Sequence, residues 1–385
     1  MSVKSAVGAS TAVSVMAAMS VILALAAPSL ARAASPEGQR QLQQMIEGAR
    51  KEGELDLMVV SSQGDKGAKE LTDAFKQRFA LDIRINADLS GQESQQFNKA
   101  SAETKAGIPS TLDLMQSEPP SVISLISDGG VEPIKNWEAL LAEIAPEAYK
   151  AKDRVSPPGV AGQAFVWGTR VTALIYNSKL ISEQDLPKTW REKGNPRFAG
   201  AYPVAPWLTI PLMCLLKYDK DECLEIVRSW GRNKKHVLSF TAATQRMMLG
   251  DVKFLFGNTE NYFAEKARDA NATIGVTFFD DLTPVREVFY VVRKGARHPN
   301  LAKLFALWVT GSEANRIFEK HTLTENLALG TGPVTQTSLQ KFKERNIKPA
   351  AWFDSQKNLE KLLWLQSNDG KEYSRAMAVA QRDGK

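Results

Sequence analysis

Hydrophobic and polar positions near the start of the chain follow two different spacings. Residues 54–60, ELDLMVV, begin with every second residue apolar and then become continuously apolar, which is typical of a strand buried on both faces. Residues 65–79 instead place apolar side chains at helical spacing, and a polar turn at 61–64 separates the two segments. The pattern therefore predicts a strand, a turn and a helix, in that order.

The same order of strand, turn and helix repeats twice more. The repeats comprise strands at 81–85 and 112–115, each followed by a helix, at 92–105 and from Pro119 onward. Strands that alternate with helices imply a parallel sheet with helices on both faces. We therefore expect an α/β fold.

The turns that follow these three strands are candidate ligand-binding loops. They span residues 61–64, 88–91 and 116–118, and they are rich in hydroxyl, amide and glycine residues. In open α/β sheets, ligands bind at the carboxyl ends of the strands. We expect Ser62, Ser90 and Ser117 to face a ligand there.

The second half of the chain also predicts strands and helices. The longest strand-like stretch is 165–177, FVWGTRVTALIYN. Further strands are expected at 253–256, 273–279 and 287–292, with helices at 260–270 and from 298 onward. This half therefore has enough elements for a second α/β unit.

Composition and charge exclude several classes of protein. Apolar residues make up 43% of the chain and charged residues 24%, which are ordinary globular values. They exclude a disordered chain, a collagen-like fibre and a multi-span membrane protein. The net charge is +6, and it is +4 without residues 1–33, which is too small and too dispersed to predict a nucleic-acid partner.

Residues 1–33 resemble a secretory signal peptide. They contain no Asp or Glu, and an apolar, Ala-rich run follows Lys4 and ends at Ala31-Arg32-Ala33. The run is short for a membrane span, and the small residues predict cleavage after Ala33. We therefore expect a periplasmic protein, whose mature chain has a net charge of +4 after the loss of Lys4 and Arg32.

The two cysteines have neither metal-binding nor redox spacing. Cys214 and Cys223 stand nine positions apart, on either side of a predicted turn. In an oxidising compartment they form either a local disulfide or two buried free thiols, and the sequence favours neither.

Sequence motifs of catalysis are absent. The chain has no G-x-S-x-G, no H-E-x-x-H, no G-x-G-x-x-G and no Walker loop. Its three histidines are scattered, and Asp280-Asp281 is predicted to form a turn. The sequence predicts no catalytic residue, no metal site and no cofactor.

Short segments along nearly the whole mature chain resemble periplasmic solute-binding proteins, the ligand receptors of ABC importers. They are A-R-K-E-G at 49–53 with the strand after it, A-L-I-Y-N at 173–177, L-P-K-T-W at 186–190, N-P-R-F-A-G at 195–200, and Gly257-Asn258 with Asn261-Tyr262. The resemblance is greatest to the branch that holds ferric-ion, polyamine and phosphorylated-solute binders.

The resemblance implies the type II architecture, in which two doubly wound α/β lobes are joined by a hinge. Lobe one would comprise 34–165 and 288–335, lobe two 172–280 and 336–385, and the hinge crossings 166–171 and 281–287. Such a protein is a monomer that binds a small molecule between its lobes and delivers it to a membrane permease.

The expected ligand is a small polar or anionic solute. Arg170 and Arg286 fall at the two proposed crossings, where guanidiniums would hold a carboxylate or phosphate. Solvated or salt-bridged surface arginines are the alternative, and Trp167 and Trp207 are either ligand walls or core residues. The candidate ligand-binding residues are Ser62, Ser90, Ser117, Arg170, Thr209, Asn258, Tyr262 and Arg286.

Three other functions remain open. Ferric-ion binders of this type carry adjacent tyrosines in the second lobe, whereas the matching segment here, Asn261-Tyr262-Phe263, has one. A secreted enzyme on the same scaffold would need a base or nucleophile in the cleft. A sensor accessory would share the pocket and differ only in its membrane partner.

Overall fold

The structure is a computed structural model that describes residues 36–385. The predicted signal peptide and its cleavage site lie outside these residues. No helix among residues 36–385 is long and apolar enough to cross a membrane.

The elements alternate between strands and helices along the chain, as expected. The strands are β1 (Glu54–Met58), β2 (Arg84–Asp88), β3 (Leu114–Ser117), β4 (Ala164–Asn177), β5 (Phe254–Asn258), β6 (Ile274–Thr277), β7 (Thr283–Val292) and β8 (Pro349–Ala350). The helices before β5 are α1 (Pro36–Glu52), α2 (Gly64–Phe79), α3 (Glu93–Ala106), α4 (Pro119–Ser127), α5 (Trp137–Ile144), α6 (Pro146–Tyr149), α7 (Lys152–Val155), α8 (Trp190–Lys193), α9 (Thr209–Leu212), α10 (Lys220–Asn233) and α11 (Phe240–Met248). Those after it are α12 (Thr259–Arg268), α13 (Pro299–Trp308), α14 (Ser312–Thr322), α15 (Pro333–Glu344), α16 (Gln356–Trp364) and α17 (Asn368–Asp383). Short 3-10 turns include η1 (Ser61–Gln63) and η5 (Met213–Leu216).

The first three strands form the predicted parallel arrangement. β1 pairs in parallel with β2 on one side and with β3 on the other. β2 begins at Arg84, three residues later than predicted. The reason is the end of α2: Ala80 adopts a left-handed backbone, and the N–H of Leu81 donates to the carbonyl of Lys76.

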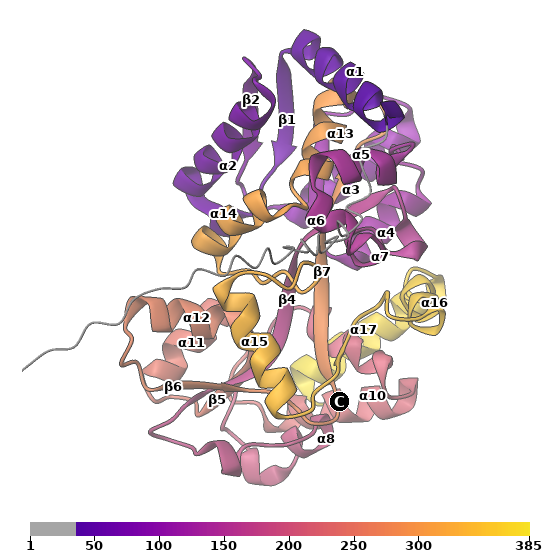
Figure 1. The fold of residues 1–385 in the computed structure, drawn as a ribbon. Coiled ribbons are helices and arrows are strands. Elements are labelled where there is room, and N and C mark those ends of the chain that lie inside the picture. Colours follow the sequence, from indigo (N-terminus) through magenta and orange to yellow (C-terminus); the bar gives the residue numbers. More distant parts are fainter. Residues whose placement is uncertain (1–35) are drawn as a thin grey trace, which may run out of the picture. The chain divides into compact units, whose positions relative to one another are not determined.

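Two long strands connect this first group of strands to a second one (Figure 1). The first part of β4 pairs antiparallel with β7, which itself pairs with β3. The last part of β4, from Thr172 onward, pairs with β5 and β6. β4 is therefore the element that belongs to both groups.

β7 begins earlier than the sequence indicates. The polar segment at 280–284 with its proline predicts a turn, and the strand was expected only from 287. In the structure β7 starts at Thr283, and Pro284 lies opposite Ala350 of β8 at the sheet edge, where a missing N–H is tolerated. Arg286 consequently lies within a strand and directly opposite Arg170.

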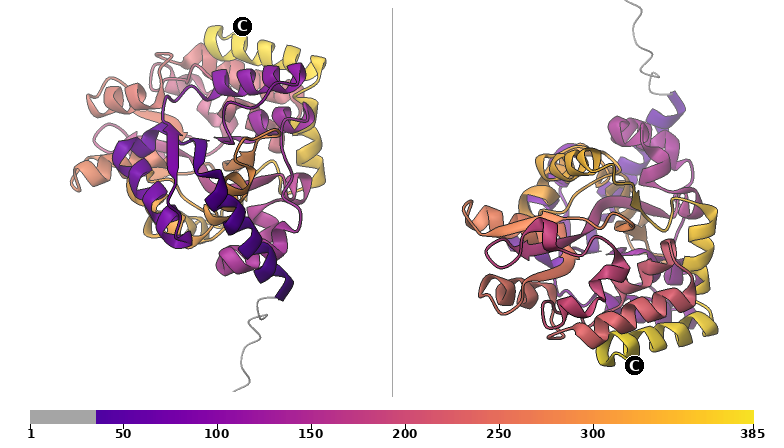
Figure 2. Two further views of the ribbon diagram at one scale, coloured as in Figure 1. Left: turned by 90° about the horizontal axis from the view of Figure 1, so that it is seen from above. Right: turned by 90° about the horizontal axis from the view of Figure 1, so that it is seen from below.

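In the second group of strands, the side chains on the two faces of β4 pack into two different hydrophobic clusters. Val171, Ala173 and Ile175 belong to a small cluster with residues of α11 and α15, whereas Leu174 packs in the main core. Figure 2 shows α17 lying along α10, and the two helices are in contact. Helices thus cover both faces of these strands, as in a doubly wound unit.

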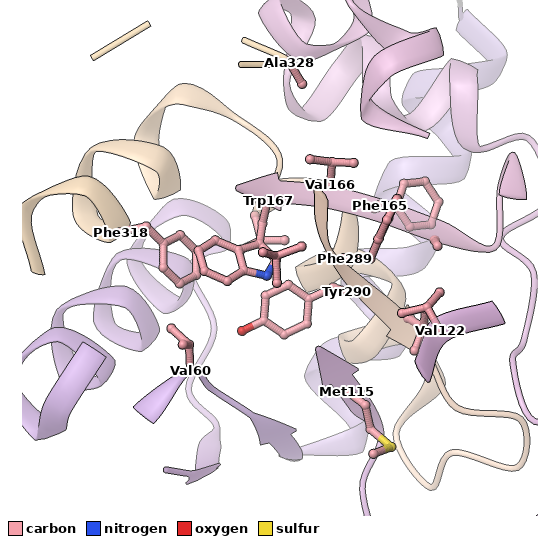
Figure 3. Packing of buried hydrophobic residues seen from close by; sticks show 14 of the residues in the cluster. Val60, Met115, Val122, Phe165, Val166, Trp167, Phe289, Tyr290, Phe318 and Ala328 are labelled. Atoms are coloured by element: carbon pink, nitrogen blue, oxygen red, sulfur yellow. The ribbon is translucent and has the colours of Figure 1, made fainter. Parts of the chain in front are cut away.

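An aromatic cluster packs beside the paired strands β4 and β7 (Figure 3). Trp167 lies in a bulge of β4, and its ring stacks on Phe318 with 4.0 Å between centroids and lies 6.2 Å from Tyr290. Trp167 is fully buried. Of its two possible roles, it is therefore a core residue.

The two cysteines form a disulfide. Cys214 in η5 is bonded to Cys223 in α10, across the turn at which Asp219 caps that helix. Of the two arrangements that the sequence left open, the structure therefore shows the bridge.

We predict that the variant Cys214→Ala/Cys223→Ala loses about 2–3 kcal/mol of unfolding free energy, because a loop closed over nine positions restricts the unfolded chain by that amount. Urea unfolding at neutral pH measures the change. Alkylation of the denatured, unreduced wild-type protein should label no thiol. Two labelled thiols and an unchanged midpoint would contradict the prediction.

Candidate functional site

Two arginines and one glutamate form the centre of the candidate site. Arg170 on β4 lies opposite Arg286 on β7, so both side chains leave the same face of the strand pair. Glu118 follows the last residue of β3 and is the residue before α4. The pairing of β3 with β7 brings this carboxylate to the arginines.

Glu118 bridges the two guanidiniums. Its Oε1 accepts hydrogen bonds from Nη1 of Arg170 and from Nη1 of Arg286, each at 2.8 Å, and its Oε2 accepts from Nη1 of Arg286 at 2.9 Å. The Arg286 side chain is only 4% exposed. These arginines are therefore salt-bridged and largely buried, unlike solvated surface residues.

The charges in this cluster depend on one another. Burial by itself raises the pKa of Glu118, but the guanidiniums of Arg286 and Arg170 outweigh it and hold that pKa below its ordinary value. Burial likewise opposes the charged form of Arg170, and nearby carboxylates, Glu260 foremost, outweigh it and raise the pKa of Arg170. Glu118 and Arg170 are consequently charged at neutral pH.

Further polar groups extend the site on both sides. Arg286 also donates to Oδ1 of Asn258, the last residue of β5. At the start of α3, Glu93 accepts from Nε2 of Gln116 at 2.9 Å and from Oγ of Ser117 at 3.4 Å. Both arginine Nε atoms are buried and have no hydrogen-bond partner, although Nε of Arg170 lies 3.8 Å from a carboxylate oxygen of Glu260.

These groups line a pocket of about 340 Å³. Its wall combines charged groups, hydroxyls and two aromatic rings. The lining residues are Glu93, Ser94, Ser117, Glu118, Pro120, Ser121, Arg170, Trp207, Thr209, Phe240, Asn258 and Arg286. Trp207 is 38% exposed and meets Phe240 edge to face, so it forms a wall of the pocket.

Five of the eight predicted ligand-binding residues line this one pocket. They are Ser117, Arg170, Thr209, Asn258 and Arg286, which lie far apart in the sequence and come from five separate segments. Whether they bind the solute stays a prediction.

The other three predicted residues lie elsewhere. Ser62 is exposed in η1, and Ser90 is exposed in the turn after β2, where its Oγ accepts from the N–H of Gln92. Tyr262 is half-buried in α12, where it packs against the small core cluster and the ring of Phe263. None of the three lines the pocket around the arginines.

The sequence prediction missed the carboxylates. Glu118 falls inside the loop 116–118 that was expected to face a ligand. Because an anionic solute was expected, however, arginines and hydroxyls were chosen as its binding residues and acidic groups were not. Glu93 stands just beyond the second candidate loop. The polarity of these loops was a usable signal, whereas the pairing of Glu118 with residues 170 and 286 follows only from the fold.

The histidines lie outside the pocket, and each interacts with a carboxylate. His236 pairs with Asp251, His298 with Asp113, and His321 with Glu70. Ligand atoms of Asp56, Asp113 and His298 come within 4.8 Å of one another, as in a metal site. There, however, the Asp113 carboxylate already accepts backbone N–H groups of Asp56, Arg297 and His298, so this cluster joins chain segments.

Comparison with known proteins places the chain in a family. The profile of the family described as "Bacterial extracellular solute-binding protein" matches residues 70–348. The chain therefore belongs to this family of extracellular solute-binding proteins. No curated protein matches the chain.

Solved structures with the same fold are periplasmic binding proteins. Iron-bound HitA from Pseudomonas aeruginosa has a TM-score of 0.58 at 17% identity, over 76% of this chain and 99% of that one. The binding protein AgtB from Agrobacterium tumefaciens in complex with agropinic acid scores 0.60 at 15% identity, over 84% and 99%. The Atu4243 GABA receptor scores 0.65 at 14% identity, over 85% and 97%.

These similarities confirm two predictions made from the sequence. The fold is the two-lobed α/β fold of periplasmic binding proteins. The class is that of an extracellular solute-binding protein.

We predict that Glu118→Gln destabilises the empty protein by about 3–5 kcal/mol, because two buried guanidiniums lose their shared counterion. Sulfate should then raise the melting temperature of the variant more than that of the wild type, since an anion can replace the lost carboxylate. Thermal unfolding with increasing sulfate measures both effects.

The matched control for this experiment is Glu70→Gln. It removes one exposed carboxylate that pairs with Lys320 and His321, and such pairs contribute at most about 1 kcal/mol. Equal stability of the Glu118 and Glu70 variants, with equal responses to sulfate, would show that the Glu118 bridge contributes no more to stability than an exposed ion pair.

Proposed function

We propose that this protein is a periplasmic receptor that captures a small polar solute with an anionic group, such as a carboxylate or phosphate, and passes it to the membrane permease of an ABC importer. One observation carries the proposal. Arg170 and Arg286 face one pocket from the two strands that connect the groups of strands, and Glu118 holds both guanidiniums there.

Glu118 has a defined part in this proposal. In the empty site it keeps the arginines oriented, so the solute meets a preformed pair of guanidiniums. The anionic group of the solute competes with Glu118 for the Nη groups. Binding therefore replaces one anion, the Glu118 carboxylate, with another, so the net charge of the pocket contributes little to the affinity.

The other residues of the pocket indicate the chemistry of the rest of the solute. Because Glu118 already offsets part of the arginine charge, the solute needs further favourable contacts. The Glu93 carboxylate and the Asn258 amide suit hydroxyl or ammonium donors, while Ser117 and Thr209 hydroxyls both donate and accept. Trp207 and Phe240 suit a short apolar segment.

The proposed hinge is consistent with this position. Arg170 lies in the expected crossing 166–171 and Arg286 in 281–287, and β4 changes its pairing partner from β7 to β5 at this point. We keep the lobes as 34–165 with 288–335 and 172–280 with 336–385. A solute held by both arginines would then bind next to the segments that move when the lobes close.

A ferric ion is the less favoured ligand. Iron-bound HitA shares the fold, but at 17% identity that likeness says nothing about the ligand here. No tyrosine is among the residues that line this pocket, and Tyr262 lies in α12 outside it. Two guanidiniums at the centre of the pocket oppose a trivalent cation.

We also infer that the protein acts by binding and not by catalysis. The lining of the pocket among residues 36–385 includes neither histidine nor cysteine, and Glu118 is held ionised by two arginines. We propose that the working form is a monomer.

A screen of the purified mature protein identifies the solute. Carboxylates, organic phosphates and ferric ion are tested by thermal shift, together with mass spectrometry of any co-purified molecule. A ligand at 100 times its Kd stabilises a protein by about 2.7 kcal/mol. Stabilisation by ferric ion alone would overturn the proposed solute class.

We predict that Arg170→Ala weakens binding of the identified solute by more than tenfold, and that Arg286→Ala does so as well. Calorimetry measures the Kd, and circular dichroism checks that each variant is folded. Arg84→Ala, which removes an exposed arginine paired with Glu54, is the matched control and should leave the Kd unchanged. An unchanged Kd in both pocket variants would exclude binding by the pair of guanidiniums.

We further predict that the exported protein starts at Ala34, because Ala31-Arg32-Ala33 has the small residues that signal peptidase requires. Intact-mass measurement of the periplasmic fraction tests this. A mass that retains residues 1–33 would contradict cleavage.

A further inference from the structure

A second pocket lies on the opposite face of the β4–β7 strand pair. Thr169 and Glu287 are cross-strand neighbours, one residue away from Arg170 and Arg286, and successive strand residues point to opposite faces. Both line a pocket of about 250 Å³, which we call the back pocket. Its lining residues are Asp153, Arg154, Pro157, Val166, Thr169, Val285, Glu287, Leu327, Ala328, Leu339, Pro349, Ala350, Ala351, Phe353 and Asp354.

The carboxyl group of Glu287 has no counterion. The residue is 9% exposed, its buried Oε2 has no hydrogen-bond partner, and no ion pair within residues 36–385 involves it. A buried polar atom without a partner is costly and rare in folded proteins. Glu118, the buried glutamate on the other face of the same strands, has two arginine partners.

The other charged groups of the back pocket do not neutralise Glu287. Asp354 adds a second carboxyl, whose Oδ2 accepts the N–H of Ala351 at 2.6 Å. Asp153 is 80% exposed at the rim, and Arg154 next to it donates to the carbonyl of Leu327 at 3.3 Å. On the strand side, the Thr169 hydroxyl accepts a hydrogen bond from the N–H of Leu327.

The remaining wall of the back pocket is apolar. Val166 and Val285 come from the two strands, Leu339 from α15, and Phe353 from the segment after β8. An occupant must therefore combine one positive group for Glu287 with a hydrocarbon surface. Hydrated metal ions lack the second property.

We propose that the back pocket is a second binding site, which takes a small protonated amine with an apolar body, its ammonium group paired with Glu287. The proposal is independent of the solute that binds beside Arg170 and Arg286, because the strand pair separates the two pockets.

Protons are linked to this binding. The pKa of Glu287 is raised to about 8, chiefly by burial; a backbone hydrogen bond of the residue itself opposes the rise, and the charges of Asp354 and Glu118 add to it. Burial also raises the pKa of Asp354. The empty site therefore holds a neutral Glu287 carboxyl group at neutral pH, and pairing with an ammonium releases its proton. Affinity should rise about tenfold from pH 6 to pH 7 and level off above pH 8.

Calorimetry with the mature protein tests the proposal with three amines, namely butylamine, cyclohexylamine and benzylamine. We expect binding of at least one, with the stated pH dependence, and binding at least tenfold weaker to Glu287→Gln. Benzyl alcohol, which has the shape of benzylamine without the charge, should bind at least tenfold more weakly than benzylamine.

Two further variants separate a local effect from a folding defect. Ala350→Leu fills the pocket from its half-buried rim without changing a carboxyl, and it should also weaken amine binding by more than tenfold. Glu70→Gln removes a carboxylate elsewhere and should leave binding unchanged. No binding of any amine at pH 8, equal binding of the alcohol, or unchanged binding to Glu287→Gln in its folded state would each overturn the proposal.

Discussion

Two positive side chains lie opposite each other on the strands β4 and β7, which connect the two groups of strands, and the Glu118 carboxylate offsets their repulsion. Arg170 and Arg286 are direct cross-strand neighbours, and such a pair is destabilising by itself. The carboxylate reaches them from the end of β3, at 2.8 Å from each. Three strands must therefore be in register before either arginine can be buried. The same condition gives the pocket its preformed pair of guanidiniums, so the packing of the strands and the proposed binding chemistry depend on one interaction.

Side-chain alternation gives the β4–β7 pair two different faces. On one face the glutamate is fully paired and ionised, and the pocket is lined by hydroxyls and charges. On the other face, at the next cross-strand pair, Glu287 lies among apolar side chains without a counterion. The two carboxyl groups belong to the same residue type and differ in pKa because of their neighbours alone. An anion suits the first face and a protonated amine the second.

Much of the fold could be predicted from local patterns. Apolar segments predicted that β1, β2 and β3 form a parallel sheet, and they predicted the long strand β4, since spacing reflects burial within each element. The start of β7 could not be predicted, because Pro284 is acceptable only at the edge where β8 pairs with it. For the site, five predicted residues meet in one pocket; Ser117 and Asn258 lie at strand ends, whereas both arginines lie within strands. Glu118 was missed because its partners lie on other strands, and Tyr262 does not line this pocket because its helix packs the ring against a core cluster.

The central claim is that the solute binds where Arg170 and Arg286 face the pocket. A crystal structure of the mature protein with its retained solute tests this most directly. The account predicts an anionic group of the solute within hydrogen-bond distance of both guanidiniums, with Glu118 displaced from at least one of them. A solute bound elsewhere, or held in this pocket without contact to either arginine, would contradict it.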